Sequence, residues 1–165
     1  MSIYLSSYWL PELDSAKVCQ RAISEKERFL FEIEESLTRT LNNKAKVEIS
    51  VRLLAQEERS NLNSYEIARL GHTDKYFFRE IYLESAIEPL VLARSITLGR
   101  SQTSDMLGRL GTSPLGTLLF NSADWDSIPS KLKLETVRGV FGSSTHWRNC
   151  RTKESLVVQE FFLPA

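Results

Sequence analysis

The fold is decided by two neighbouring runs, Lys75-Tyr-Phe-Phe-Arg79-Glu-Ile-Tyr-Leu-Glu84 and Leu90-Val-Leu-Ala-Arg94-Ser-Ile-Thr-Leu98. Both runs are rich in β-branched, aromatic and aliphatic residues, which is typical of β-strands. The segment between them, Ser85-Ala-Ile-Glu-Pro89, is polar at both ends and contains a proline. The pattern therefore predicts an antiparallel hairpin.

Two arginines interrupt the apolar faces of this predicted hairpin. Side chains alternate between the two faces of a strand, so Arg79 and Arg94 each share a face with apolar residues. These neighbours are Phe77, Ile81 and Leu83 for Arg79, and Leu90, Leu92, Ile96 and Leu98 for Arg94. A guanidinium cannot release its proton, and burying it without an acceptor is very unfavourable. We therefore expect an internal carboxylate or an anionic ligand to meet both side chains.

A third ionisable residue, Glu160, interrupts the strongly β-forming run 155–163. This run carries apolar residues on both faces, which favours a central strand and gives Glu160 apolar neighbours. Glu160 could pair with one arginine in a structural bridge, although such buried pairs add little stability. One carboxylate would also leave one positive charge over. Spacing alone leaves a ligand pocket and a structural network equally open.

The remaining elements are predicted from periodicity and capping signals. Alternation predicts strands over 46–53, 131–137 and 145–151. Residues 56–71 are polar and favour a loop, with a helical turn at 65–70 left open, and 121–130 is a turn-rich link. Helical signals follow Ser24 (a capping box with Glu27), follow Ser36 (over 37–41) and span 103–110. Strands outnumber helices, and the hairpin favours antiparallel order. We expect a single α+β domain over residues 1–165, a mainly antiparallel sheet with helices packed on one face.

A further helix start is predicted at Ser113-Pro-Leu115-Gly116. Ser113 is a suitable N-cap, and Pro114 suits the first helical position. The amides of Leu115 and Gly116 would then be free donors at the positive end of a helix, suited to a carboxylate or phosphate. Taken alone, such a pattern is more often only the start of a helix.

Composition excludes several classes of function. The 165 residues carry no formal net charge, which argues against nucleic-acid binding. No apolar run approaches membrane-spanning length, and the first residues lack the basic start of a secretory signal. Cys19 and Cys150 are far apart, and His72 and His146 lack metal-ligand spacing. We expect a cytoplasmic protein without a metal or a disulfide framework.

Four blocks of the sequence together resemble one enzyme family. They are Tyr76-Phe-Phe-Arg79-Glu-Ile, Glu88-Pro-Leu-Val-Leu-Ala-Arg94, Leu110-Gly-Thr-Ser-Pro-Leu115-Gly with Leu119-Phe120, and the ending Gln159-Glu160-Phe-Phe-Leu-Pro-Ala. In order and spacing they resemble chorismate pyruvate-lyase. The resemblance implies a six-stranded antiparallel sheet with helices on one side. It also implies cleavage of chorismate into 4-hydroxybenzoate and pyruvate without a cofactor, a step that feeds quinone biosynthesis.

The resemblance also implies roles for five residues. Arg79 matches the arginine that grips the ring carboxylate, and Leu115 matches the residue whose amide meets the same group. Glu160 matches the acid near the 4-hydroxyl and the leaving ether oxygen. Arg94 matches a second arginine, along the access route or at the other carboxylate. Leu37 falls where the family commonly has a methionine, and its contact is partly through the main chain.

Two other classes of function stay open at this stage. The chain could be a non-catalytic domain that binds an aromatic acid, because the effector domains of some transcription regulators share this fold. It could also be a structural protein whose arginines are all paired internally. For the lyase, we expect a monomer whose partners are chorismate and 4-hydroxybenzoate, with release of the enclosed product limiting turnover.

Overall fold

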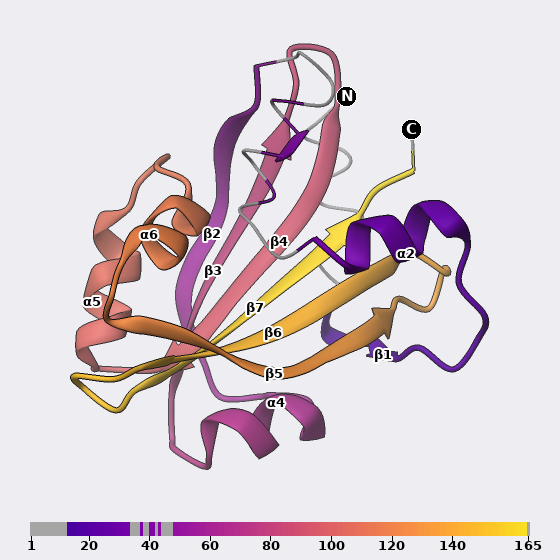
Figure 1. Cartoon of the computed structure of the whole chain (residues 1–165). Helices are drawn as coiled ribbons and strands as arrows, with labels where there is room; N and C mark the ends of the chain where they lie inside the picture. Colours follow the sequence, from indigo (N-terminus) through magenta and orange to yellow (C-terminus); the bar gives the residue numbers. More distant parts are fainter. Residues whose placement is uncertain (1–12, 34–36, 38–39, 42, 44–47, 165) are drawn as a thin grey trace.

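A computed structural model describes residues 13–33, 37, 40–41, 43 and 48–164. Within them, one seven-stranded antiparallel sheet has the order β1-β5-β6-β7-β4-β3-β2 (Figure 1). The strands are β1 Lys17–Val18, β2 Ser50–Arg59, β3 Tyr76–Glu84, β4 Pro89–Leu98, β5 Trp125–Glu135, β6 Phe141–Asn149 and β7 Ser155–Phe162. The helices are α2 Glu25–Phe31, α4 Ser64–Leu70, α5 Gln102–Arg109 and α6 Leu115–Asn121. The predicted α+β class is confirmed. The sheet has one strand more than the six expected, because the two-residue β1 pairs with β5 at one edge.

The predicted hairpin is β3 and β4, and its register determines where the arginines point. Arg79 lies opposite Ser95, whereas Arg94 lies opposite Glu80. Directly opposed residues of an antiparallel pair project from the same face. Arg79 and Arg94 therefore project from opposite faces of the sheet, and the two apolar rows do not meet on one side. The two arginines therefore cannot meet one ligand from the same side of the sheet.

Three strands differ from the sequence prediction. β6 begins at Phe141, four residues before the predicted start at 145, and β2 and β5 are longer than expected. β2 begins at Ser50 and continues to Arg59, through residues predicted to be loop, while 46–47 lie outside the described residues. β2 is an edge strand, so its polar Gln56-Glu-Glu-Arg59 end faces solvent and lacks an apolar alternation. β5 begins at Trp125, inside the predicted link, and its pairing with β6 shifts between Ile128 and Leu132. Pro129 lies in that shift, as prolines in strands commonly do.

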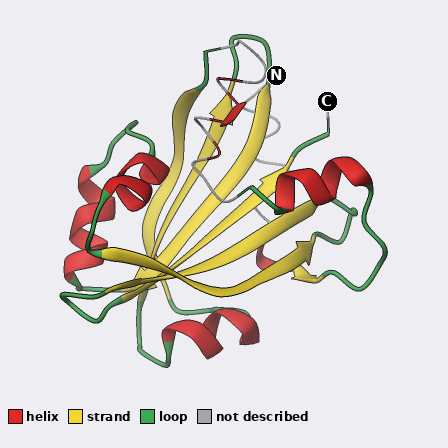
Figure 2. Cartoon of the chain, in the orientation of Figure 1, coloured by secondary structure: helices red, strands yellow, loops and turns green. Residues whose placement is uncertain are grey.

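Three of the four described helices lie on the face that carries Arg79. Residues of α5 and α6, including Leu107 and Leu119, form one core cluster with Trp147 of β6. The exception to the expected arrangement is α4, whose buried Glu66 accepts a hydrogen bond of 2.7 Å from Gln159 on the other face. Figure 2 shows the helices distributed around the sheet in this way.

The helix starts are mostly where capping signals predict them. Ser24 and Glu27 form the predicted capping box of α2. The residues at 37 and 40–41 are helical, while Ser36, their predicted cap, lies outside the described residues. The helix predicted over 103–110 is α5.

The described part of the chain contains no candidate membrane-spanning helix, disulfide or metal cluster. No helix there has the length and apolar character needed to cross a membrane. Cys19 and Cys150 are free thiols. Over the same residues, no group of three or more His, Cys, Asp or Glu side chains is arranged to hold a metal ion.

Candidate functional site

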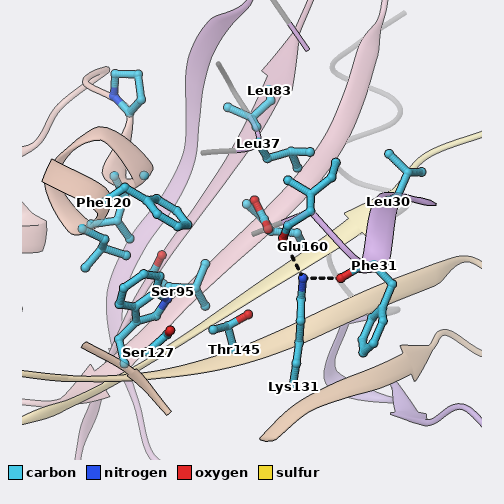
Figure 3. Close-up of a pocket in the computed structure, with 18 of the residues that line it drawn as sticks. Leu30, Phe31, Leu37, Leu83, Ser95, Phe120, Ser127, Lys131, Thr145 and Glu160 are labelled. Atoms are coloured by element: carbon cyan, nitrogen blue, oxygen red, sulfur yellow. Dashed lines mark hydrogen bonds between the residues drawn. The ribbon is translucent and has the colours of Figure 1, made fainter. Parts of the chain in front are cut away.

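A cavity of about 570 Å³ lies between the Arg79 face of the sheet and helices α2 and α6 (Figure 3). This volume is in the range of sites that hold small organic molecules. Its lining is mostly aliphatic and aromatic, with a few polar side chains. The polar and ionisable lining residues are Glu32, Arg79, Ser95, Ser127, Lys131, Thr145 and Glu160.

The structure brings four of the five sequence-predicted residues to this cavity. Arg79 comes from β3, Glu160 from β7 and Leu115 from the start of α6, and Leu37 completes the group. β-Sheet register explains the first two: Glu160 is opposite Ala93, which is opposite Ile81, the next residue on the face of Arg79. Arg94 does not line the cavity.

Arg79 is a buried cation without an anionic partner. Arg79 is only 1% exposed to solvent. Its Nη2 donates to the carbonyl oxygens of Gly111 and Ser113, at 3.0 and 3.1 Å. Nε has no hydrogen-bond partner among the described residues, and none of their carboxylates pairs with Arg79. Burial lowers the pKa of Arg79 from its usual value. A bound carboxylate would supply the missing charge.

The segment that meets Arg79 is shaped by a glycine. Gly111 has a φ of 59°, in the left-handed region that other residues rarely adopt. This conformation belongs to the turn between α5 and α6, which presents the carbonyl groups of Gly111 and Ser113 to the guanidinium. The loop therefore fixes Arg79 beside the first residues of α6.

Helix α6 begins one residue later than predicted. Pro114, not Ser113, is the N-cap, and Leu115 is the first helical residue. The extended ψ of 129° at Pro114 explains the shift, because an N-cap residue is non-helical. Leu115 and Gly116 still contribute the first amides of the helix and line the cavity, near the positive end of its dipole.

Arg94 takes an internal partner on the opposite face. Its Nε donates to Oε2 of Glu80 at 2.8 Å, and its Nη2 lies 2.7 Å from both that oxygen and Oδ1 of Asp14. Glu80 is fully buried and also pairs with Arg59. In this structure Arg94 lies outside the cavity lining and has internal counter-charges, so its expected role along the access route or at the other carboxylate stays a prediction. Glu80 lies directly opposite Arg94, and only the strand register reveals that pairing.

Glu160 is a buried carboxyl group whose pKa is close to neutral pH. Burial raises its pKa to about 7, and the nearby Lys131 opposes the shift. Glu160 forms no hydrogen bond or ion pair with Arg79 or Arg94, so the structural-bridge alternative does not hold for it. A carboxyl with this pKa can hold or release a proton close to neutral pH.

Lys131 is a basic cavity residue that the sequence analysis did not predict. Its Nζ donates to the carbonyl oxygens of Phe31 and Ile33 at the end of α2, the latter at 3.2 Å. Figure 3 shows this ammonium directed toward Glu160. On a weakly alternating strand, Lys131 had no signal that separated it from a solvated lysine. The small polar residues Ser127 and Thr145 gave no signal either.

Stability should depend on pH through Glu160. Because the pKa rises from 4.5 in the unfolded chain to about 7, the native state alone holds a proton between these values. The stabilisation is fully present below the lower value and is lost as pH rises through the upper one. The free energy of unfolding of the wild type, relative to Glu160→Gln, should fall by up to about 1.4 kcal/mol per pH unit in this window. Urea unfolding checks this, and a difference that stays constant or rises with pH would contradict it.

The charges on the Arg94 face should be structural. Glu80→Gln leaves Arg94 and Arg59 short of a buried counter-charge, and we expect a loss of about 3–5 kcal/mol in the free energy of unfolding. Glu57→Gln is the matched control, because it removes the exposed partner of the same Arg59. It should lose at most about 1 kcal/mol. Equal losses in urea unfolding would show that Glu80 has no special role.

Comparisons with known proteins agree with this geometry. The chain matches the family model described as chorismate lyase over residues 8–165. A search of curated proteins found no significant match.

Two solved structures share the fold. PhnF from Mycobacterium smegmatis has a TM-score of 0.56 at 8% identity; the likeness covers 79% of this chain and 64% of PhnF, just under two thirds of its length. The effector domain of PhnF has a TM-score of 0.54 at 10% identity, covering 78% of this chain and 88% of that domain. Such low identities support the fold alone. The family match, in contrast, spans nearly all of the sequence. The chain belongs to the chorismate lyase family.

Proposed function

We propose that this protein converts chorismate into 4-hydroxybenzoate and pyruvate. The observation that carries the proposal is Arg79, a buried guanidinium without a carboxylate partner among the described residues, on the wall of a cavity of about 570 Å³. Burying such a charge is unfavourable unless an anion meets it. The carboxylate of a cyclic acid is the right size and charge for this position.

Substrate binding begins at the ring carboxylate. Arg79 donates to it, and the amide of Leu115 at the start of α6 provides a second donor from the same side of the cavity. Leu37 and the other apolar residues cover the ring and exclude water. These contacts hold the substrate in the reactive diaxial conformer, in which the ether oxygen and the 4-hydroxyl group are both axial and the C4 hydrogen lies on the same face of the ring as the ether.

The reaction is an elimination that needs little covalent help. The C3–O ether bond breaks and its electron pair leaves with the enolpyruvyl group, while C4 loses its hydrogen and the ring becomes aromatic. Transfer of that proton to the methylene carbon of the enolpyruvate gives pyruvate, so all atoms balance. Glu160 orients the 4-hydroxyl group or handles the proton, and a pKa of about 7 suits either role.

Product release should be slow. 4-Hydroxybenzoate keeps the carboxylate that binds Arg79 and the hydroxyl group that faces Glu160, so it retains most of the substrate's contacts. We therefore propose product inhibition, with release limiting turnover. We also propose that the product feeds quinone biosynthesis in the cytoplasm, a location that suits the free thiols of Cys19 and Cys150, and that the enzyme is a monomer.

A non-catalytic role is the second candidate. The fold that the chain shares with the PhnF effector domain supports a domain that binds a small ligand without changing it. Binding of 4-hydroxybenzoate without any consumption of chorismate would favour this candidate.

The direct test is to incubate the purified protein with chorismate and to follow both products. We expect equal amounts of 4-hydroxybenzoate and pyruvate. Arg79→Met should lower kcat/KM at least about 100-fold, because binding and turnover are lost together. Glu160→Gln should act mainly on kcat, by about 10²-fold or more. Arg148→Met is the control, because Arg148 is an exposed arginine on β6.

The absence of product above the spontaneous rate would reject the lyase. Normal turnover by Glu160→Gln would reject the role given to that residue. A loss in Arg148→Met as large as that in Arg79→Met would mean that charge in general, rather than the buried site, is responsible.

A further inference from the structure

Chorismate is a dianion, and the described lining of the cavity contains two basic side chains, Arg79 and Lys131. Arg94, the residue expected to be the second cation, lies on the other face of the sheet. We propose that Lys131 binds the second carboxylate of the substrate, the one on the enolpyruvyl side chain. This inference rests on the proposed function and adds a specificity-determining residue to it.

The two cations lie at opposite walls of the cavity. Arg79 is held by carbonyl groups of Gly111 and Ser113, in the segment that leads into α6. Lys131 is held by carbonyl groups of Phe31 and Ile33, at the end of α2. In Figure 3, Phe120 of α6 and Leu30 of α2 mark these two walls, and Lys131 lies on the α2 side. The site therefore has a positive charge at each end.

The position of Glu160 fixes which carboxylate meets which cation. In chorismate the 4-hydroxyl group is opposite the ring carboxylate, and the enolpyruvyl ether is on the carbon beside it. With the ring carboxylate at Arg79 and the 4-hydroxyl group at Glu160, the ether side chain lies at the Glu160 end. Lys131 is at that end, directed toward Glu160 (Figure 3), and its charge lowers the pKa of that carboxyl.

Two contacts of Lys131, those with Phe31 and Ile33, suit an exchange of acceptors. Phe31 and Ile33 offer neutral carbonyl oxygens, whereas a carboxylate is a charged and stronger acceptor. A carboxylate of the entering dianion can therefore compete with these two carbonyl groups for the ammonium. 4-Hydroxybenzoate lacks the second carboxylate, so Lys131 should contribute to its binding much less than to that of the substrate.

The test compares two stable ligands by calorimetry. One is 4-hydroxybenzoate, with one carboxylate; the other is its 3-(1-carboxyethoxy) derivative, which carries a second carboxylate on an ether. Lys131→Gln keeps a donor for the carbonyl groups but removes the charge. We expect it to weaken binding of the dicarboxylate at least about tenfold and that of 4-hydroxybenzoate less than about twofold. Lys131→Arg should restore most of the dicarboxylate affinity.

The control is Lys133→Gln. Lys133 lies two residues along β5 on the same face, is exposed, and also has its ammonium over the ring of Phe31, but it does not line the cavity. Its substitution should leave both affinities unchanged. Equal weakening of both ligands by Lys131→Gln, or no weakening of either, would overturn the inference. If the wild type binds both ligands as expected and yet consumes no chorismate, the lyase proposal fails and the role of Lys131 in binding stands.

Discussion

One interaction that the protein leaves incomplete organises the candidate site: the buried guanidinium of Arg79 meets two neutral carbonyl groups, and none of the described carboxylates pairs with it. Such a charge lowers stability unless something compensates for it. The α5–α6 turn, with its left-handed Gly111, fixes the guanidinium in place, and the cavity leaves room beside it. The cation is thus prepared before any ligand arrives, so little of the binding free energy is lost in ordering it.

The two faces of the sheet differ in how they treat their buried arginine: one face pairs it with carboxylates, and the other leaves it beside the cavity. On the Arg94 face, the carboxylates of Glu80 and Asp14 pair with the buried arginine, and Glu80 also pairs with Arg59. On the Arg79 face, Arg79 and Glu160 do not pair, and α2 and α6 border a cavity beside the packed clusters of that face. β7 takes part in both, because its neighbouring residues Gln159 and Glu160 project to opposite faces. Gln159 ties α4 to the sheet through Glu66, which supports the strand that carries the acid.

Much of the fold could be predicted from sequence, because its signals are local. The hairpin, the capping box of α2 and the strand that carries Glu160 all follow from alternation or from short capping patterns. The partners of the two arginines could not be predicted in the same way. Each sits in an apolar row, and only the register between two strands decides that Arg94 meets Glu80 whereas Arg79 meets Ser95. Lys131 was missed for a related reason: its partners at the end of α2 are about a hundred residues away in sequence, and no pattern in β5 indicates them.

The central claim is that the charge of Arg79 is completed by the carboxylate of a cyclic acid. A crystal structure of the protein with 4-hydroxybenzoate tests it most directly. We predict that the carboxylate lies within hydrogen-bond distance of Arg79 and of the Leu115 amide, with the 4-hydroxyl group at Glu160. A ligand bound elsewhere, or in this cavity with its carboxylate turned away from Arg79, would contradict the claim.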